Sequence, residues 1–266
     1  MRIVRIQTSS GQIHHGSLQN DDSIHRIEGD ILGDYQVTNE KISGKRLAPI
    51  APSMIFCIGL NYRQHAEETG AKIPKFPVLF MKGINTVQNP GDPILIPTKL
   101  ASHQVDYECE LAVVIGKTCK NVSKEKALEY VLGYTVANDV SARDWQKDFG
   151  GSQWCRGKTF DTFCPLGPVL VTPDEIPNPN ALQLKTTISG TVYQDLNTND
   201  MIFDVPTVIE FLSGSTTLLP GTVILTGTPQ GVGMALNPPR WLKPGDEVRV
   251  EIEKIGALIN PVLNEP

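Results

Sequence analysis

The 266-residue sequence contains no long hydrophobic run. Its longest apolar stretches, such as residues 111–115, are far shorter than the roughly 20 residues that a membrane-spanning helix needs. Residues 1–6 alternate charged and apolar side chains, as a half-buried strand does, and they lack the apolar core of a signal peptide. We therefore expect no membrane segment and a cytoplasmic protein, or a mitochondrial one if the source is eukaryotic and a transit peptide is missing from this sequence.

The sequence also lacks an excess of positive charge and any C-x-x-C pair. Its net charge is -5, with 24 Lys and Arg against 29 Asp and Glu, whereas a duplex nucleic-acid binder needs clustered cations to neutralise phosphates. We expect a small-molecule substrate and no nucleic-acid partner. The odd number of cysteines favours reduced, packed thiols over disulfides or zinc ligands, and the five are Cys57, Cys109, Cys119, Cys155 and Cys164.

Sustained alternation of strands and helices is absent as well, which excludes a doubly wound fold. Residues 1–52 predict a small N-terminal β module, because their short strand patterns are broken by glycines and end at Pro49 and Pro52. Residues 53–266 predict a second domain of many strands and short helices. We therefore predict an α+β fold that is mainly β, with short peripheral helices.

Three of the expected helices have recognisable ends. Asn61 can cap a helix that stops at Gly70, and Asp204 with Pro206 can start another. Between them, Ser123 can cap a helix that ends at Gly133. The apolar side chains of that middle helix have helical spacing, and they are Ala127, Leu128, Val131 and Leu132.

Two carboxylates, Glu108 and Glu110, stand at positions i and i+2 of a predicted strand and so share one face. For an isolated pair, a solvated strand face is the ordinary explanation. Here an apolar run continues the strand and indicates burial, and a third acid, Asp139, ends another apolar strand. Carboxylates without nearby His or Cys suit a hard cation, so we predict a Mg²⁺ site on these three residues.

Arg143, Gln146 and Lys158 are candidates to complete this site. Arg143 and Gln146 would share a face if the segment after Asp139 is helical, and Arg can bind a carboxylate through two hydrogen bonds. Lys158 could stabilise an enolate or an oxyanion. Taken singly, each is more often a surface side chain.

His65 and Glu68 form a candidate catalytic dyad. At i,i+3 spacing on a helical turn, a carboxylate can orient an imidazole and raise its basicity. An ordinary exposed turn explains the same spacing, and the two explanations stay open at this stage.

The stretch 226–233 resembles a phosphate-binding loop only superficially. It lacks the G-K-[ST] ending, and no helix is predicted after it. We expect instead a tight turn that presents backbone N–H groups and the Thr228 hydroxyl.

Taken together, these segments resemble the fumarylacetoacetate hydrolase family from about Ile55 to Val250. Within the family they resemble the smaller members of the FAH-domain-containing protein 2 type, which share the stretch Gly150-Gly151-Ser152-Gln153-Trp154. The shared family motifs are Gly59-Leu60-Asn61-Tyr62 with His65 and Glu68, Tyr107-Glu108-Cys109-Glu110-Leu111, Gly133-Tyr134, Asn138-Asp139-Val140-Ser141-Ala142-Arg143-Asp144, Gly157-Lys158 with Asp161-Thr162-Phe163, Asp200-Met201-Ile202-Phe203, and Leu225-Thr226-Gly227-Thr228-Pro229.

The resemblance implies that residues 53–266 form the catalytic domain, with a mixed β-roll or β-sandwich core. A homodimer and a divalent metal, usually Mg²⁺ or Mn²⁺, are implied as well. It also implies roles, in which His65 and Glu68 form a dyad on a mobile lid and Lys158 is the catalytic lysine. By the same matching, the metal ligands and substrate contacts are Glu108, Glu110, Asp139, Arg143, Gln146 and Thr228. Two features of fumarylacetoacetate hydrolase proper, a fourth carboxylate ligand and a long N-terminal domain, have no counterpart that we can place here.

These observations predict a Mg²⁺-dependent enzyme that acts on small 2-oxo acids by stabilising an enolate. We place hydrolysis of the C–C bond of an acylpyruvate first. Keto-enol tautomerisation of oxaloacetate, or its decarboxylation, on the same site is the alternative. A non-catalytic β protein that binds a structural cation is a more remote one.

Overall fold

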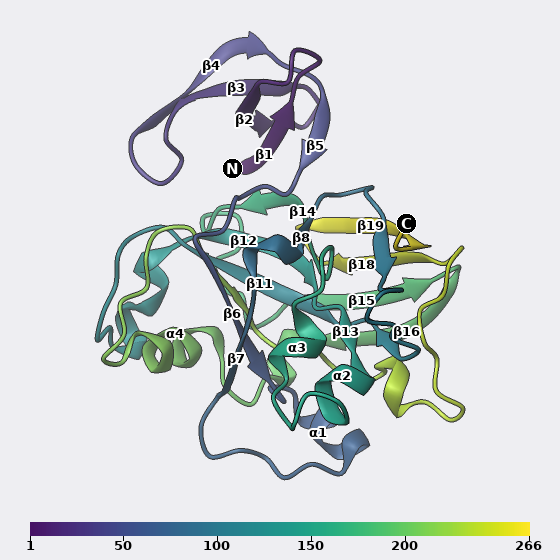
Figure 1. Ribbon diagram of the computed structural model, residues 1–266. Coiled ribbons are helices and arrows are strands. Elements are labelled where there is room, and N and C mark those ends of the chain that lie inside the picture. Colours follow the sequence, from purple (N-terminus) through teal and green to yellow (C-terminus); the bar gives the residue numbers. More distant parts are fainter.

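The structure, a computed structural model, describes residues 1–266. A large mixed sheet of 12 strands extends from the N-terminal module into the body of the molecule (Figure 1). Its main path is β4(Tyr35–Lys41), β3(Ile24–Gly29), β2(Ile13–Leu18), β1(Arg2–Gln7), β14(Cys164–Val171), β12(Val131–Asn138), β11(Cys109–Ile115), β17(Thr222–Leu225), β6(Met54–Gly59) and β7(Val78–Lys82). Two further strands pair beside this path, β5(Lys45–Leu47) with β1 and β8(Val87–Gln88) with β14.

A second sheet of five strands packs against the central strands of the first. Apolar side chains from both sheets, such as Leu111 and Val113 of β11 with Leu184 and Val250, belong to one buried core. Its order is β16(Thr191–Asn197), β15(Gln183–Ile188), β18(Glu247–Ile252), β19(Gly256–Asn264) and β9(Ile94–Ile96), and a separate two-stranded sheet joins β10(Val105–Asp106) to β13(Ser141–Ala142).

The helices are short and peripheral, as the sequence predicts. They are α1(Arg63–Thr69), α2(Arg143–Lys147), α3(Cys155–Lys158) and α4(Val205–Ser213), with 3-10 turns at η1(Ile84–Thr86), η2(Lys124–Tyr130), η3(Thr198–Asp200) and η4(Gly233–Ala235). None has the length and apolar character required to span a bilayer. The prediction of a mainly β fold with few short helices is therefore confirmed.

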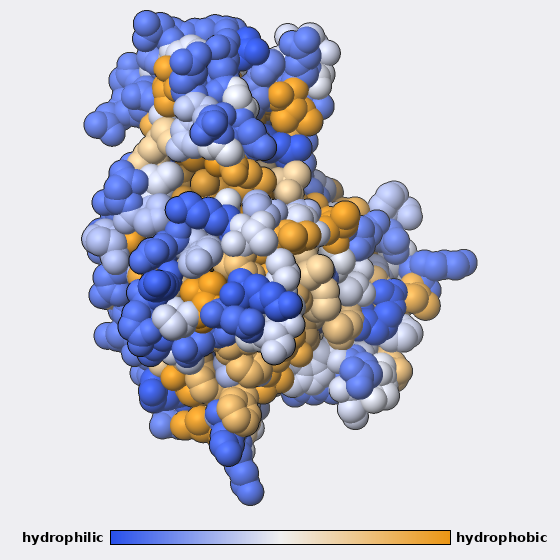
Figure 2. Space-filling model, turned by 90° about the vertical axis from the view of Figure 1, so that its left-hand side faces the viewer, coloured by the Kyte–Doolittle hydropathy of each residue, from blue (hydrophilic) through white to orange (hydrophobic).

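The N-terminal strands β1 to β5 form a small module above the body in Figure 1. The module is joined to the body by the pairing of β1 with β14, in which Ile3 lies opposite Leu170. Ile3 and Ile27 of the module share a buried cluster with Ile55 and Leu170 of the body. On the face shown in Figure 2, the module is largely hydrophilic, whereas apolar residues gather over the body. The domain boundary near residue 52 stays a prediction.

Two of the predicted helices differ in detail from the structure. The segment after Ser123 is a 3-10 turn that ends at Tyr130, and Val131 and Leu132 already belong to strand β12. Ala127 and Val131 belong to one buried cluster, against which Leu128 packs, whereas Leu132 packs against another, so the apolar spacing does not mark a single helical face. Helix α1 does end at Gly70, in a left-handed conformation with φ of 64°, but Asn61 does not cap it, because its side chain binds Phe203 and Thr226 instead.

Candidate active site and metal centre

The antiparallel pairing of β11 with β12 brings the three predicted metal ligands together. In this register Cys109 lies opposite Asn138, so that Glu108 and Asp139 meet just beyond the paired ends. The backbone N–H of Asp139 donates to the Glu108 carbonyl at 2.9 Å. One carboxylate oxygen from each of Glu108, Glu110 and Asp139 lies within 4.8 Å of the others, and all three side chains are buried.

Three buried cations surround these carboxylates. Lys158 Nζ donates to Glu108 Oε2 at 2.8 Å and to Asp139 Oδ2 at 2.7 Å. Lys82 Nζ donates to Asp139 Oδ1 at 2.6 Å, and Arg143 Nη2 donates to Glu108 Oε1 at 2.7 Å. Burial alone would raise the pKa of Glu108, but Lys158 and Arg143 outweigh it and hold that pKa below its usual value.

Glu110 is the member of the cluster that has no cationic partner. Its carboxylate accepts a hydrogen bond from the Gly227 backbone N–H at 2.6 Å. Burial, together with the neighbouring Asp139 and Glu108, raises the pKa of Glu110 well above its usual value. A buried all-carboxylate set with one uncompensated member fits a hard divalent cation such as Mg²⁺. The structure places no fourth acid in this cluster.

Helix α1 carries the predicted dyad. His65 Nδ1 lies 2.7 Å from Glu68 Oε1, and Glu68 Oε2 accepts a hydrogen bond from the Gly231 backbone N–H at 2.9 Å. With Nδ1–H donating to Glu68, the other ring nitrogen, Nε2, is left as a proton acceptor. Glu68 therefore both orients His65 and links α1 to the loop that contains Thr228.

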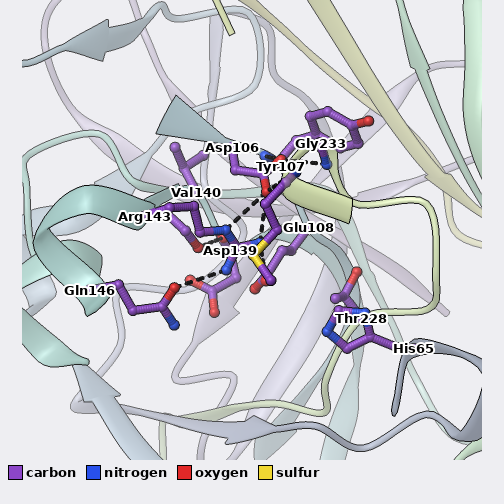
Figure 3. A network of polar contacts seen from close by, with 12 residues as sticks. His65, Asp106, Tyr107, Glu108, Asp139, Val140, Arg143, Gln146, Thr228 and Gly233 are labelled. Atoms are coloured by element: carbon purple, nitrogen blue, oxygen red, sulfur yellow. Dashed lines mark hydrogen bonds and ion pairs between the residues drawn. The ribbon is translucent and has the colours of Figure 1, made fainter. Parts of the chain in front are cut away.

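The candidate substrate contacts lie on opposite sides of the acids. Arg143 and Gln146 share one face of α2, where Arg143 Nη1 donates to Gln146 Oε1 at 3.0 Å. His65 and Thr228 lie together on the other side of Glu108 (Figure 3). The Thr228 hydroxyl donates to the Cys109 carbonyl at 3.1 Å, so the loop around it is tied to β11.

One cavity of about 250 Å³ joins these groups. Of the nine residues predicted for the site, seven line it; the other two, Glu68 and Asp139, contact lining residues, since Glu68 binds His65 and Asp139 binds Lys158. Part of the remaining wall is apolar, with Leu60, Phe80, Trp154 and Met234. Trp154 packs directly against Gly59, where an added Cβ would lie only 2.3 Å from the indole ring. The cavity thus has a charged side and an apolar side.

Sequence reasoning missed three residues that organise the site. Asp106 accepts hydrogen bonds from Arg143 Nε at 2.9 Å and from the Gly233 backbone N–H at 2.7 Å. Buried Gln194 donates to Thr228 Oγ1 at 2.8 Å. Lys82, the third, ends strand β7. Asp106 could have been found, because it extends the i,i+2 series of Glu108 and Glu110, but Lys82 and Gln194 carry no signal of that kind.

Replacing Lys82 by methionine is expected to lower the free energy of unfolding by about 3 kcal/mol, because it leaves one oxygen of buried Asp139 without its cation. Urea denaturation in EDTA measures the change. Lys117→Met, at an exposed position, is the matched control and should stay within about 0.5 kcal/mol of the wild type. If the two variants are equally stable, the Lys82–Asp139 pair is unimportant for folding.

Two family profiles match the chain. Residues 54–263 match the profile described as fumarylacetoacetate (FAA) hydrolase C-terminal, and residues 1–48 match one described as Rv2993c-like, N-terminal. The profiles therefore cover the body and the N-terminal module separately.

Curated relatives agree with the first profile. A protein of Xenopus laevis named oxaloacetate tautomerase fahd2, mitochondrial, is 51% identical over 82% of this chain and 68% of its own length. The human protein named oxaloacetate tautomerase FAHD2A, mitochondrial, is 48% identical over 82% of this chain and 69% of its own. A Dictyostelium discoideum protein named fumarylacetoacetate hydrolase domain-containing protein 2 homolog is 50% identical over 81% and 73%.

Solved structures extend the likeness over the full length of the chain. A 5-carboxymethyl-2-hydroxymuconate delta-isomerase from Mycobacterium smegmatis superposes with a TM-score of 0.87 at 38% identity, and both chains are covered completely. A fumarylacetoacetate hydrolase from Exiguobacterium antarcticum superposes with a TM-score of 0.89 at 35% identity, again over both whole chains. Sequence, fold and the buried acidic cluster lead to one conclusion, that this chain is an enzyme of the fumarylacetoacetate hydrolase family.

Proposed function

We propose that this enzyme catalyses keto-enol tautomerisation of a small 2-oxo acid, and that oxaloacetate is its substrate. The sequence analysis placed acylpyruvate hydrolysis first and this reaction second. Relatives about half identical to the chain are named oxaloacetate tautomerases, and a similar solved structure is named an isomerase. These names support tautomerisation better than hydrolysis. The non-catalytic alternative has no support among these relatives.

The names of these relatives favour tautomerisation over hydrolysis, and the observation that supports the proton transfer itself is a single oriented base beside the acidic cluster. Tautomerisation needs one group that removes a proton from oxygen or carbon and returns it to the other atom. His65 meets this need, because Glu68 holds its Nδ1 and leaves Nε2 to accept and donate that proton. Hydrolysis would require, in addition, a positioned water and cleavage of a C–C bond.

The other predicted residues would bind the substrate and stabilise charge on its oxygens. A divalent cation held by Glu108, Glu110 and Asp139 would act as a Lewis acid toward the 2-oxo oxygen. Buried Lys158 would place its positive charge beside that oxygen. Further substrate contacts would come from Arg143, Gln146 and Thr228, which line the same cavity. We propose Mg²⁺ as the cation, with Mn²⁺ as a substitute.

A product assay separates the two reactions. Purified protein with Mg²⁺ is given enol-oxaloacetate and, separately, acetylpyruvate, an acylpyruvate. The proposal expects accelerated loss of the enol absorbance with no pyruvate or CO₂ formed, and acetylpyruvate that stays intact. Release of acetate and pyruvate from acetylpyruvate, at a rate comparable to the loss of the enol, would contradict the proposal and support a hydrolase. Formation of pyruvate from oxaloacetate would indicate decarboxylation.

We further propose that the protein is a homodimer, as the family resemblance implies. Strand β7 is an edge of the large sheet, and its Leu79 and Met81 side chains are exposed, as expected of a surface that another subunit covers. Light scattering during size-exclusion chromatography should give twice the 29.1 kDa of the chain. A mass of one chain at micromolar concentration would contradict this.

A further inference from the structure

The cavity contains three side-chain cations, and two of them are already paired with carboxylates of the protein. Arg143 uses Nε for Asp106, Nη1 for Gln146 and Nη2 for Glu108. Lys158 binds Glu108 and Asp139, and its Nζ lies 4.9 Å from the centre of the Phe80 ring. Both cations therefore lie at the acidic cluster, where they would meet the 2-oxo end of a substrate and not a second anionic group at its far end.

Lys147 is the third cation. It is the last residue of α2, four positions after Arg143, so both side chains lie on the same face of the helix. Lys147 lines the cavity, and it takes no part in the ion pairs that hold Arg143 and Lys158. Lys147 is exposed, so it lies at the outer end of the cavity, and partial burial together with the neighbouring Arg143 lowers its pKa.

Apart from Thr69, Gln146 and Thr228, which offer only neutral hydrogen-bonding groups, the uncharged side chains of the cavity wall are apolar. Leu60, Phe80, Trp154 and Met234 are apolar, and an anion left against such a wall would lose its hydration without compensation. The carboxylate and 2-oxo group at one end of the substrate would bind the cation that the acidic cluster holds. Lys147 is therefore the lining cation that remains to pair with a carboxylate at the other end.

We propose that Lys147 binds the distal carboxylate of the substrate and so makes the enzyme selective for dicarboxylic over monocarboxylic 2-oxo acids. This inference rests on the proposed function, because it assigns the far end of the same substrate. It makes Lys147 a specificity-determining residue with no part in the proton transfer.

The experiment compares enol-oxaloacetate with its 4-methyl ester, in which the distal charge is removed. The wild type should prefer the dicarboxylate about tenfold in kcat/KM, the gain expected from a hydrogen bond between charged groups. In Lys147→Met this preference should fall to within about twofold, and in Lys147→Arg it should be restored. The exposed Lys117→Met variant is the matched control and should keep the wild-type preference.

A binding measurement provides the second readout. Oxalate can chelate a cation at the acidic cluster, but it has no distal carboxylate for Lys147 to bind. Its affinity in the presence of Mn²⁺ should therefore change less than about twofold in Lys147→Met. If wild type and Lys147→Met show the same preference, the assignment of Lys147 is wrong while the proposed function stands. If the wild type accelerates tautomerisation of neither compound, the proposed function itself fails.

Discussion

Replacing Glu110 by glutamine is expected to reduce the affinity for Mg²⁺ by at least about a hundredfold. The loss of a carboxylate that only supports a metal ligand already costs about 10-fold to 100-fold, and Glu110 is predicted to be a ligand itself. The substitution keeps the shape of the side chain and the acceptor for the Gly227 N–H. Titration with Mn²⁺, followed by electron paramagnetic resonance, measures the affinity. Exposed Glu247→Gln is the matched control and should bind Mn²⁺ like the wild type.

Although it weakens metal binding, the Glu110→Gln substitution should not lower the thermal stability of the metal-free protein. Burial, with Asp139 and Glu108, raises the folded-state pKa of Glu110. The stability that Glu110 contributes is therefore complete below the unfolded pKa of about 4.3 and is lost as pH rises through the raised folded value. At neutral pH in EDTA, Glu110→Gln should melt at or above the wild-type temperature, whereas only the wild type should gain from added Mg²⁺. A variant that is less stable in EDTA and gains equally from Mg²⁺ would contradict the metal assignment.

Replacing His65 by asparagine is expected to lower kcat for enol-oxaloacetate by about 10²-fold or more, the usual effect of removing a general acid-base group. Mn²⁺ affinity should stay within about twofold, because His65 lies beside the carboxylates and is not one of the predicted ligands. Stopped-flow measurement of the enol absorbance gives the rate.

The exposed His103→Asn variant serves as the control for this substitution and should retain full activity. Glu68→Gln should fall between the two, because glutamine can still accept a hydrogen bond from Nδ1–H but does not raise the basicity of the ring. A His65→Asn variant with more than a third of the wild-type rate would show that another group moves the proton.

Local patterns predicted much of the carboxylate cluster. Alternation along one strand was enough to place Glu108 and Glu110 on one side, and the apolar run after them indicated burial. Asp139 was assigned to the cluster because it ends a second apolar strand. That Asp139 lies beside Glu108 depends on the register of β11 with β12, which cannot be derived from the spacing of residues within either strand.

What the sequence did not predict depends on contacts between distant segments. Lys82 reaches Asp139 across 57 positions, and Gln194 reaches Thr228 across 34. The first turn of α1 shows the same limit, because the Gln64 N–H is bound by Asp200 from η3 and not by a preceding residue. The sequence also could not decide between hydrolysis and tautomerisation as the reaction of this enzyme, since both would use the same base, cation and lysine.

The most direct measurement is a crystal structure of the protein soaked with Mn²⁺ and oxalate, in which anomalous scattering locates the metal. We predict one strong peak at coordination distance from an oxygen of each of Glu108, Glu110 and Asp139, with oxalate bound on its open side toward Arg143 and Lys158. A peak elsewhere, or none at saturating Mn²⁺ with Lys158 still bridging Glu108 and Asp139, would contradict the proposed metal centre.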